Sequence, residues 1–185
     1  MNPRSEHLSF RALGQFAAAM LVAAGEALAQ EKQAVAATRR IVISIPDRKL
    51  ALIEDGRVLK IYSTAVGAPS TPSPAGVYTI AQRLPNPTWY GPHKVVGPGA
   101  ANPLGTRWMG LSRKGYGIHG TNRPRSIGRN ASHGCIRMRN RDVEELFELV
   151  SVGDAVELQD ERTAAVAAIF GPEPQTVSLQ AIAGQ

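Results

Sequence analysis

The sequence predicts a mainly β, single-domain protein with one main α-helix at about residues 141–150. Short β-branched runs separated by turn residues fill most of the chain, and a single segment has clear helical spacing. A length of 185 residues suits one domain. Hydrophobic residues make up 43% of the chain, enough for a core, while 18 Gly and 13 Pro indicate many turns. Collagen-like and disulfide-framework proteins are excluded.

The first 29 residues have the order of a signal peptide. Arg4 and Arg11 precede or flank the start of an apolar segment at 13–24, and Ala27–Ala29 offers an A-x-A cleavage site. We therefore expect export, most simply to a periplasm. The alternative is an N-terminal amphipathic helix that stays in the mature protein. Beyond this segment no apolar run reaches the roughly 18 residues of a membrane span, so we expect a protein that is not membrane-spanning.

The domain is predicted to begin with a strand and a β-hairpin. Residues 40–45 form a β-branched run. Residues 50–54 and 57–66 then flank Asp55-Gly56, and both of these turn residues tolerate the positive φ of a two-residue hairpin. This turn pair predicts antiparallel pairing of the two flanking strands.

The middle of the chain alternates predicted strands with loops. Residues 77–84 are a strand, entered through a loop with prolines that cannot donate to a strand ladder. Residues 85–105 are rich in Pro, Gly and Asn, and such a long loop within a domain is typical of a functional segment. Short strands are expected at 106–112 and 116–119.

The C-terminal part contains the one clear helix. Asn140 is the expected N-cap, and apolar residues then repeat at helical spacing at Val143, Leu146, Phe147 and Val150. A last strand is expected at 155–159. The tail beyond it has no clear element: it is either disordered or its Ala-rich part forms a short docked helix. The chain thus divides into signal peptide, linker, domain and tail, at 1–29, 30–39, 40–159 and 160–185.

The charge balance is basic, with 21 Lys and Arg against 15 Asp and Glu, a formal net charge of +6. The charges within residues 1–29 cancel, so the exported chain would keep this excess. The basic residues are scattered from Arg39 to Arg141, without the clustered pattern of a nucleic-acid-binding helix. We expect a carboxylate-bearing cell-wall partner and no nucleic acid; a nucleic-acid binder would show a steep salt dependence.

Cys135 is the only cysteine and cannot form an internal disulfide. An unpaired thiol in an exported protein is usually either buried or reactive. Cationic residues nearby in sequence would favour its nucleophilic thiolate, and His119 and His133 are close enough in sequence to act as its base. An inert thiol remains an alternative. A zinc site with ligands from His93, His119, His133 and Cys135 is a weaker alternative. Its His133-x-Cys135 spacing is rare in structural zinc sites.

Several motifs in order closely resemble the L,D-transpeptidase catalytic domain, often called YkuD-type. The family pattern is a histidine, about fourteen to seventeen residues, and then Ser/Thr-His-Gly-Cys; here fifteen residues separate His119 from Cys135. The resemblance extends from about Arg40 to Leu158. The motifs that carry it are HGTN at 119–122, SHGCIRM at 132–138, TPSPAGVY at 71–78, NPTW at 86–89 and NPLGTRWM at 102–109.

The resemblance implies a β-sandwich fold and acyl transfer through a thioester. Cys135 would attack the third-residue carbonyl of a peptidoglycan stem tetrapeptide and expel the terminal D-Ala, while His119 takes the thiol proton and passes it to the leaving amine. An amine then resolves the thioester, from a second stem peptide or from an outer-membrane protein or lipoprotein. Hydrolysis instead would make the protein an L,D-carboxypeptidase. No cofactor and no metal are implied.

The resemblance also suggests roles for neighbouring residues. Gly134 would allow close approach of the backbone to substrate, His133 would support the oxyanion or orient the thiol, and Ser132 would hydrogen bond within the site. Substrate binding is expected from Arg137, Trp89, Tyr116 and Gly117.

Other roles are open for some of these residues. Arg137 could pair with Asp142 or Glu144 on the helix, and His133 could be structural. Trp108 is expected to pack in the core, and His93 to be solvated. A non-catalytic wall-binding module would be expected to lack Cys135 or His119, and both are present.

Overall fold

The structure is a computed structural model that describes residues 38–172. The predicted signal peptide, the linker up to residue 37 and residues 173–185 of the tail lie outside the described residues. Among the residues described, no helix is long and apolar enough to cross a membrane.

The architecture is mainly β, as predicted, and is built on one eight-stranded sheet of order β11-β9-β8-β5-β12-β1-β2-β3. Two small two-stranded sheets, β10-β4 and β6-β7, complete it. All neighbours in the main sheet are antiparallel except β1-β12 and β11-β9. The strands are β1 Arg39–Ser44, β2 Lys49–Glu54, β3 Arg57–Ser63, β4 Val66–Gly67, β5 Gly76–Pro85, β6 Trp89–Tyr90, β7 Val95–Val96, β8 Arg107–Leu111, β9 Gly117–His119, β10 Asn130–Ser132, β11 Ile136–Arg137 and β12 Ala155–Gln159.

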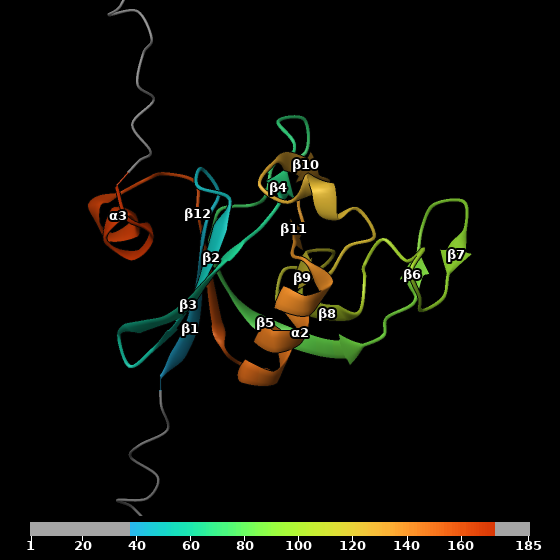
Figure 1. Cartoon of the computed structure of the whole chain (residues 1–185), viewed down its shortest axis with the longest axis horizontal. Coiled ribbons are helices and arrows are strands. Elements are labelled where there is room, and N and C mark those ends of the chain that lie inside the picture. Colours follow the sequence, from blue (N-terminus) through green and yellow to red (C-terminus); the bar gives the residue numbers. More distant parts are fainter. Residues whose placement is uncertain (1–37, 173–185) are drawn as a thin grey trace, which may run out of the picture. The chain divides into compact units, whose positions relative to one another are not determined.

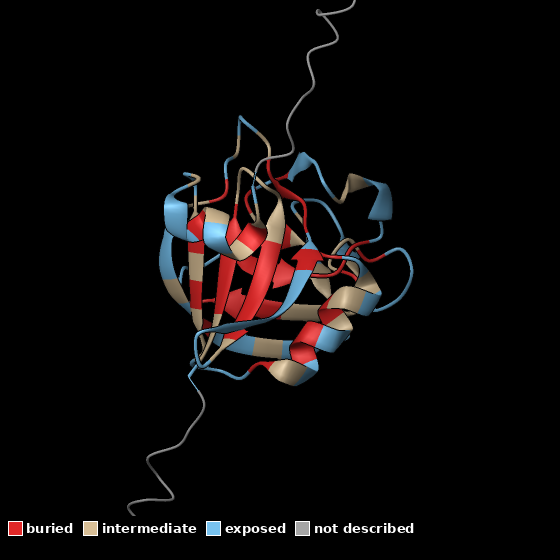
Figure 2. Ribbon diagram, turned by 60° about the vertical axis from the view of Figure 1, so that its left-hand side comes forward, coloured by how far each residue is buried: buried red, intermediate tan, exposed pale blue. Residues whose placement is uncertain are grey.

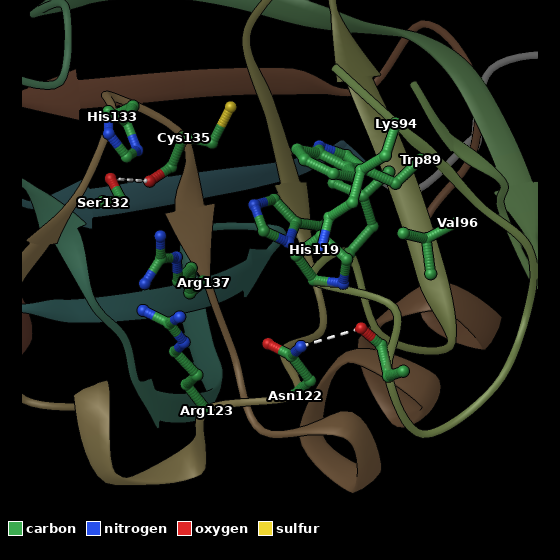
Figure 3. A pocket seen from close by; sticks show the side chains of 13 residues that line it. Trp89, Lys94, Val96, His119, Asn122, Arg123, Ser132, His133, Cys135 and Arg137 are labelled. Carbon is green, nitrogen blue, oxygen red and sulfur yellow. Dashed lines mark hydrogen bonds between the residues drawn. The ribbon is translucent and has the colours of Figure 1, made fainter. Parts of the chain in front are cut away.

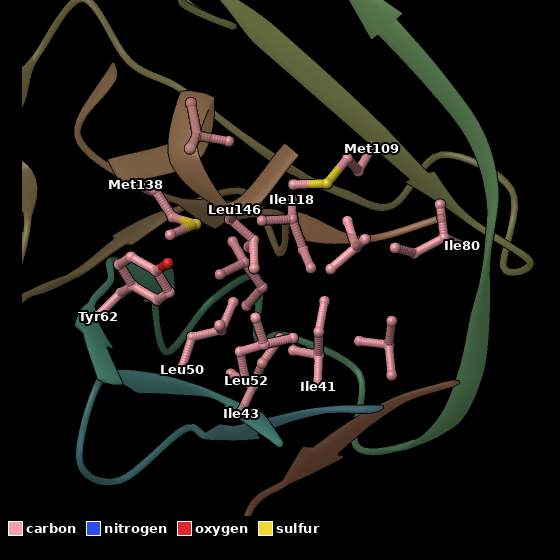
Figure 4. Packing of buried hydrophobic residues seen from close by; sticks show 14 of the residues in the cluster. Ile41, Ile43, Leu50, Leu52, Tyr62, Ile80, Met109, Ile118, Met138 and Leu146 are labelled. Carbon is pink, nitrogen blue, oxygen red and sulfur yellow. The ribbon is translucent and has the colours of Figure 1, made fainter. Parts of the chain in front are cut away.

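Strand β5 curls this sheet into the two layers expected of a sandwich (Figure 1). Its first residues pair with β12 and its later ones with β8, with a register shift between Ile80 and Gln82. A bulge bends the strand that carries it, so the two halves of the sheet face each other. The main hydrophobic core lies between them, with Ile41 and Leu52 on one side and Met109 and Ile118 on the other (Figure 4).

Strands β1 and β2 are buried on both faces, which explains their nearly continuous apolar sequence. Ile41 points into the main core, whereas its neighbour Val42 belongs to a second cluster on the opposite face. The predicted hairpin joins β2 to β3, and its turn residues Asp55 and Gly56 have φ of 49° and 76°. The predicted hairpin turn and its antiparallel pairing are confirmed.

Helix α2, Asn140–Leu149, covers the core from outside the sheet (Figure 2). Val143, Leu146 and Phe147 are its buried residues. Asn140 is not the N-cap as predicted, because Arg139 occupies that position without a side-chain cap. The amide oxygen of Asn140 instead accepts a hydrogen bond from the backbone N–H of Thr121 at 3.0 Å.

The beginning of the tail forms a docked helix, α3, Ala164–Phe170. Thr163 caps it by accepting a hydrogen bond from Val166 N at 3.3 Å. Val166 and Phe170 pack on Val42, Ala51 and Ile53, so α3 closes the second face of the β1-β2 sheet. Of the two alternatives for the Ala-rich stretch, the docked helix is the one found.

Two loop regions differ from the sequence prediction. The strand predicted at 57–66 breaks after Ser63, because Thr64 N bonds Arg48 O and Ala65 then pairs with Arg137. The chain therefore changes partner strands at this point. The long loop at 85–105 contains the hairpin β6-β7, which stands away from the main sheet (Figure 1).

Candidate active site

The predicted catalytic residues meet where β9 and β11 run side by side. The two strands are parallel, with Ile136 opposite Ile118 and Arg137 opposite His119. Because side chains alternate along a strand, the two isoleucines enter the core while His119 and Arg137 lie on the other face. Cys135 directly precedes β11. Because it lies two residues before Arg137, its side chain is on the same face as that of Arg137. All three line one pocket.

A tight turn between β10 and β11 presents Cys135. The hydroxyl of Ser132 accepts a hydrogen bond from Gly134 N at 3.0 Å and donates one to Cys135 O at 2.5 Å. Gly134 has a φ of 105°, which disfavours any side chain there. A Cβ atom on Gly134 would also lie 2.7 Å from Cε1 of Tyr116. Ser132, Gly134 and Tyr116 therefore shape the turn that holds the thiol.

The pocket has a volume of about 450 Å³ and opens beside these residues (Figure 3). Six predicted site residues line it: Trp89, His119, Ser132, His133, Cys135 and Arg137. The predicted residues Tyr116, Gly117 and Gly134 do not line the pocket. The remaining lining residues are Lys94, Val96, Ala101, Pro103, Leu104, Asn122 and Arg123.

Trp108 contacts the candidate base, although the sequence favoured core packing. It lies opposite His119 in the β8-β9 ladder, and the two ring centroids are 5.7 Å apart with the planes inclined by 30°. A Cβ atom on Gly117 would lie 2.6 Å from Cη2 of Trp108. Glycine at position 117 therefore makes room for the indole that packs beside His119.

His119 is buried, with 5% of its surface exposed. Burial lowers its pKa to about 4, more than the nearby backbone carbonyls of Gly120 and Leu104 raise it, and the charge of Arg137 lowers it further. The ring is therefore neutral at pH 7. Its Nδ1 lies 2.6 Å from the carbonyl oxygen of Gly120. A carbonyl can only accept, so Nδ1 carries the proton and Nε2 holds the free lone pair.

Cys135 is half-buried, and burial raises its thiol pKa. The backbone of Gly117 and the charge of Arg137 lower this pKa, but they do not outweigh burial. The resting residue is therefore a thiol and not the thiolate that nearby cations suggested. Its Sγ donates to the carbonyl of Gly115 at 3.6 Å and points away from the His119 ring (Figure 3).

Arg137 has no carboxylate partner among the residues described. The alternative pairing with the helix is not found: Asp142 pairs with Arg139 and Arg141. Burial and the nearby charge of Arg123 both lower the pKa of Arg137. Arg137 is thus a cation that faces the pocket without a neutralising acid from the described chain.

The hairpin β6-β7 supplies the predicted Trp89 and two pocket residues that the sequence did not identify, Lys94 and Val96. Trp89 and Val96 are cross-strand partners and line the pocket with Lys94. The buried side chain of Asn102 fixes this loop. Its amide nitrogen donates to the carbonyls of Pro87, Val96 and Gly97 at 2.7, 3.2 and 3.0 Å, and its oxygen accepts from Leu104 N at 2.8 Å.

The described residues contain no group of three His, Cys, Asp or Glu side chains that could hold a metal ion. His93 is exposed, as expected, and lies outside the lining of the pocket. A zinc site built from His93, His119, His133 and Cys135 therefore has no support from the geometry.

These observations describe one class of protein: a β-rich domain with a curled sheet and a pocket at its β9-β11 edge. The thiol of Cys135, a candidate nucleophile, and the neutral imidazole of His119 both line that pocket. Residues 38–158 match the YkuD family, the L,D-transpeptidase catalytic domain. The chain belongs to this family, as the sequence motifs predicted.

Relatives and solved structures agree with this membership. The YkuD protein of Bacillus licheniformis is 44% identical over 119 residues, which are 64% of this chain and 64% of that protein. The YqjB protein of Bacillus subtilis is 38% identical over 65% of this chain and 71% of its own length. The structure of an L,D-transpeptidase from Mycobacterium smegmatis matches with a TM-score of 0.57 and 25% identity, over 66% of this chain and 59% of that one.

Proposed function

We propose that this protein is a peptidoglycan L,D-transpeptidase with Cys135 as nucleophile. It cleaves a stem tetrapeptide after the third residue, releases D-Ala and transfers the acyl group to an amine. The observation that carries the proposal is the β9-β11 register, which puts Cys135, His119 and Arg137 on one face in one pocket. The signal-like order of residues 1–29 supports action outside the cytoplasmic membrane.

The first step is a proton transfer coupled to attack. The neutral ring of His119 accepts the thiol proton at Nε2 as Sγ bonds to the carbonyl carbon. Before this, Sγ turns about the Cα–Cβ bond, away from the carbonyl of Gly115. Collapse of the tetrahedral intermediate breaks the C–N bond, and His119 returns the proton to the amine of D-Ala. The product is a thioester on Cys135.

The developing oxyanion needs hydrogen-bond donors. The amide of Gly134 already donates to the hydroxyl of Ser132, so it is not a free donor for the substrate. This leaves the Cys135 amide and the ring of exposed His133 as the donor candidates on this turn. Ser132 acts indirectly, by holding the turn in the conformation that directs the Cys135 amide toward substrate.

The test is exchange of the terminal D-Ala. The full chain is incubated with a disaccharide-tetrapeptide and an excess of a non-native D-amino acid, and products are read by mass spectrometry. We expect exchange that disappears in Cys135→Ala, with unchanged thermal unfolding of the variant. Formation of tripeptide without exchange would make the protein an L,D-carboxypeptidase. If a folded sample forms neither the exchange product nor the tripeptide, the proposal is contradicted.

A further inference from the structure

Arg123 and Arg137 form a pair of cations at one side of the pocket. Both line the pocket, and their guanidinium groups lie side by side (Figure 3). They come from different segments: Arg137 from β11, and Arg123 from the loop that follows β9. The backbone N–H of Arg123 donates to the hydroxyl of Thr121 at 3.0 Å, and Thr121 N bonds the side chain of Asn140 at 3.0 Å. The start of helix α2 thus fixes this loop.

Neither arginine has a carboxylate partner within residues 38–172. The ion pairs of the described chain use other cations, and no Asp or Glu lines the pocket. Like charges held close together repel each other, and the charge of Arg123 contributes to the lowered pKa of Arg137. Two planar guanidinium groups that converge in this way match the two oxygens of a carboxylate.

The position of this pair relative to His119 identifies which carboxylate fits. Arg137 lies directly opposite His119, the residue that hands a proton to the departing amine. The departing D-Ala carries a carboxylate on the carbon next to that amine. His119 donates a proton to the departing amine and accepts one from the incoming amine. The incoming amine therefore reaches the thioester from the side by which D-Ala leaves. An acceptor with the same α-amino carboxylate group would therefore place its carboxylate at the same point.

We propose that Arg123 and Arg137 form a carboxylate clamp that holds the α-carboxylate of the departing D-Ala and then that of the acceptor. The inference rests on the proposed function and narrows the class of acceptor amine. The preferred acceptor is an α-amino carboxylate, such as a free D-amino acid or the D-centre of a diaminopimelate side chain. As its nitrogen bonds to the acyl carbon, the C–S bond breaks and the acceptor proton passes through His119 to sulfur. A lysine ε-amine has no adjacent carboxylate and is a poor acceptor.

The first test compares D-methionine with D-methioninamide as acceptors in the tetrapeptide exchange assay. The amide lacks the charge but keeps the amine. We expect kcat/KM to favour D-methionine by about 10-fold or more, the range of a charge-assisted hydrogen bond. Arg123→Gln should remove this preference by raising KM for D-methionine, with little change for the amide. Arg125→Gln is the matched control: it removes the same charge from the same loop, but Arg125 does not line the pocket.

The second test needs no turnover. Iodoacetate and iodoacetamide alkylate the same thiol and differ in the carboxylate, so the ratio of their rate constants at Cys135 reports the clamp. We expect this ratio to fall in Arg123→Gln and to stay at the wild-type value in Arg125→Gln.

The two tests separate this inference from the function on which it rests. Cys135-dependent exchange without preference for D-methionine would overturn the clamp and leave the transpeptidase proposal intact. An unchanged alkylation ratio in Arg123→Gln would also overturn it. A ratio that depends on Arg123, in a protein that catalyses no exchange, would support a carboxylate site and contradict the transpeptidase.

Discussion

The two halves of the main sheet, β12-β1-β2-β3 and β11-β9-β8, are built in different ways. In the first half, β1 and β2 are six residues long, pair along their whole length and bury both faces. In the second half, β9 and β11 have only three and two residues. Ile118 and Ile136 on one face of this strand pair belong to the main core, and the other face carries His119 and Arg137, which line the pocket. The long strands form the core, and the short strands hold the pocket residues beside the same core.

Among substitutions that keep Cys135 and His119, the largest expected effect on activity is at Gly134. Gly134→Ala adds a Cβ 2.7 Å from the Tyr116 ring, at a φ of 105°. Because small displacements of a nucleophile cost roughly 100-fold in rate, we expect a loss of that order in D-amino acid exchange. Gly128→Ala is the control: its φ is 87°, but no atom lies within 4 Å of the added Cβ. Equal activity of the two variants would contradict this account of the turn.

Core truncations test whether stability and chemistry are separable. Leu52→Ala and Ile118→Ala each remove a fully buried side chain of the same core. Each should lower the free energy of unfolding by about 2–5 kcal/mol, measured by urea denaturation. Exchange by the folded fraction should stay near wild type in Leu52→Ala. It should fall in Ile118→Ala, because Ile118 precedes His119 in β9. A loss of exchange in both variants would show that the two halves of the sheet are coupled.

The buried histidine should make both activity and stability depend on acidity. His119 must be neutral to accept a proton, and its pKa is lowered to about 4. The acid limb of kcat/KM should therefore lie near pH 4 instead of near 6.5. Trp108→Leu, which removes the ring beside His119, should move this limb toward neutrality. An acid limb near 6.5 in the wild type would contradict the neutral buried imidazole.

The protonation of His119 also determines whether stability rises or falls with pH. Its pKa is about 6.5 when unfolded and about 4 when folded, so acid protonates the unfolded state first. Stability is complete above about pH 6.5 and falls as the pH approaches 4, by about 3 kcal/mol at most. Urea unfolding across this range should show a shallower loss in His119→Gln. An identical slope would mean that other groups cause the acid destabilisation.

The smallest effect concerns helix α3, none of whose residues lines the pocket. Thr163→Ala removes the N-cap hydrogen bond to Val166 and should cost about 1 kcal/mol of stability. Thr163→Ser keeps the hydroxyl and is the control. Exchange rates should be unchanged in both, since α3 packs on β1 and β2 only at the second cluster. Slower exchange by Thr163→Ala would show that helix α3 contributes to activity and would contradict this expectation.

The half of the sheet that contains β1 and β2 was predictable from sequence, and the half that carries the pocket residues only in part. The apolar, β-branched runs on either side of Pro46-Asp47 and the Asp55-Gly56 turn are local signals, so β1, β2 and the hairpin follow from them. The approach of His119 to Cys135 follows from motif order. The two-residue strands β6 and β7 are too short to show a period. Arg123 is one arginine in a loop, and its place beside Arg137 arises only from tertiary packing.

The protonation state of Cys135 also needed the structure. Nearby cations in the sequence favour a thiolate, but the burial that raises the thiol pKa depends on how strands distant in sequence pack around it. Asn140 gives a similar lesson. Its type and position suit an N-cap, yet its side chain bonds Thr121 across the fold, which no local pattern encodes.

The covalent intermediate is the most direct test of the central claim. The full chain is mixed with a disaccharide-tetrapeptide without acceptor, quenched in acid at short times and analysed by intact-protein and peptide mass spectrometry. We predict an adduct of the disaccharide-tripeptide acyl mass on the peptide that contains Cys135, which is absent in Cys135→Ala and which D-methionine removes. An adduct on another residue, or release of D-Ala with Cys135 replaced by alanine, would contradict the account.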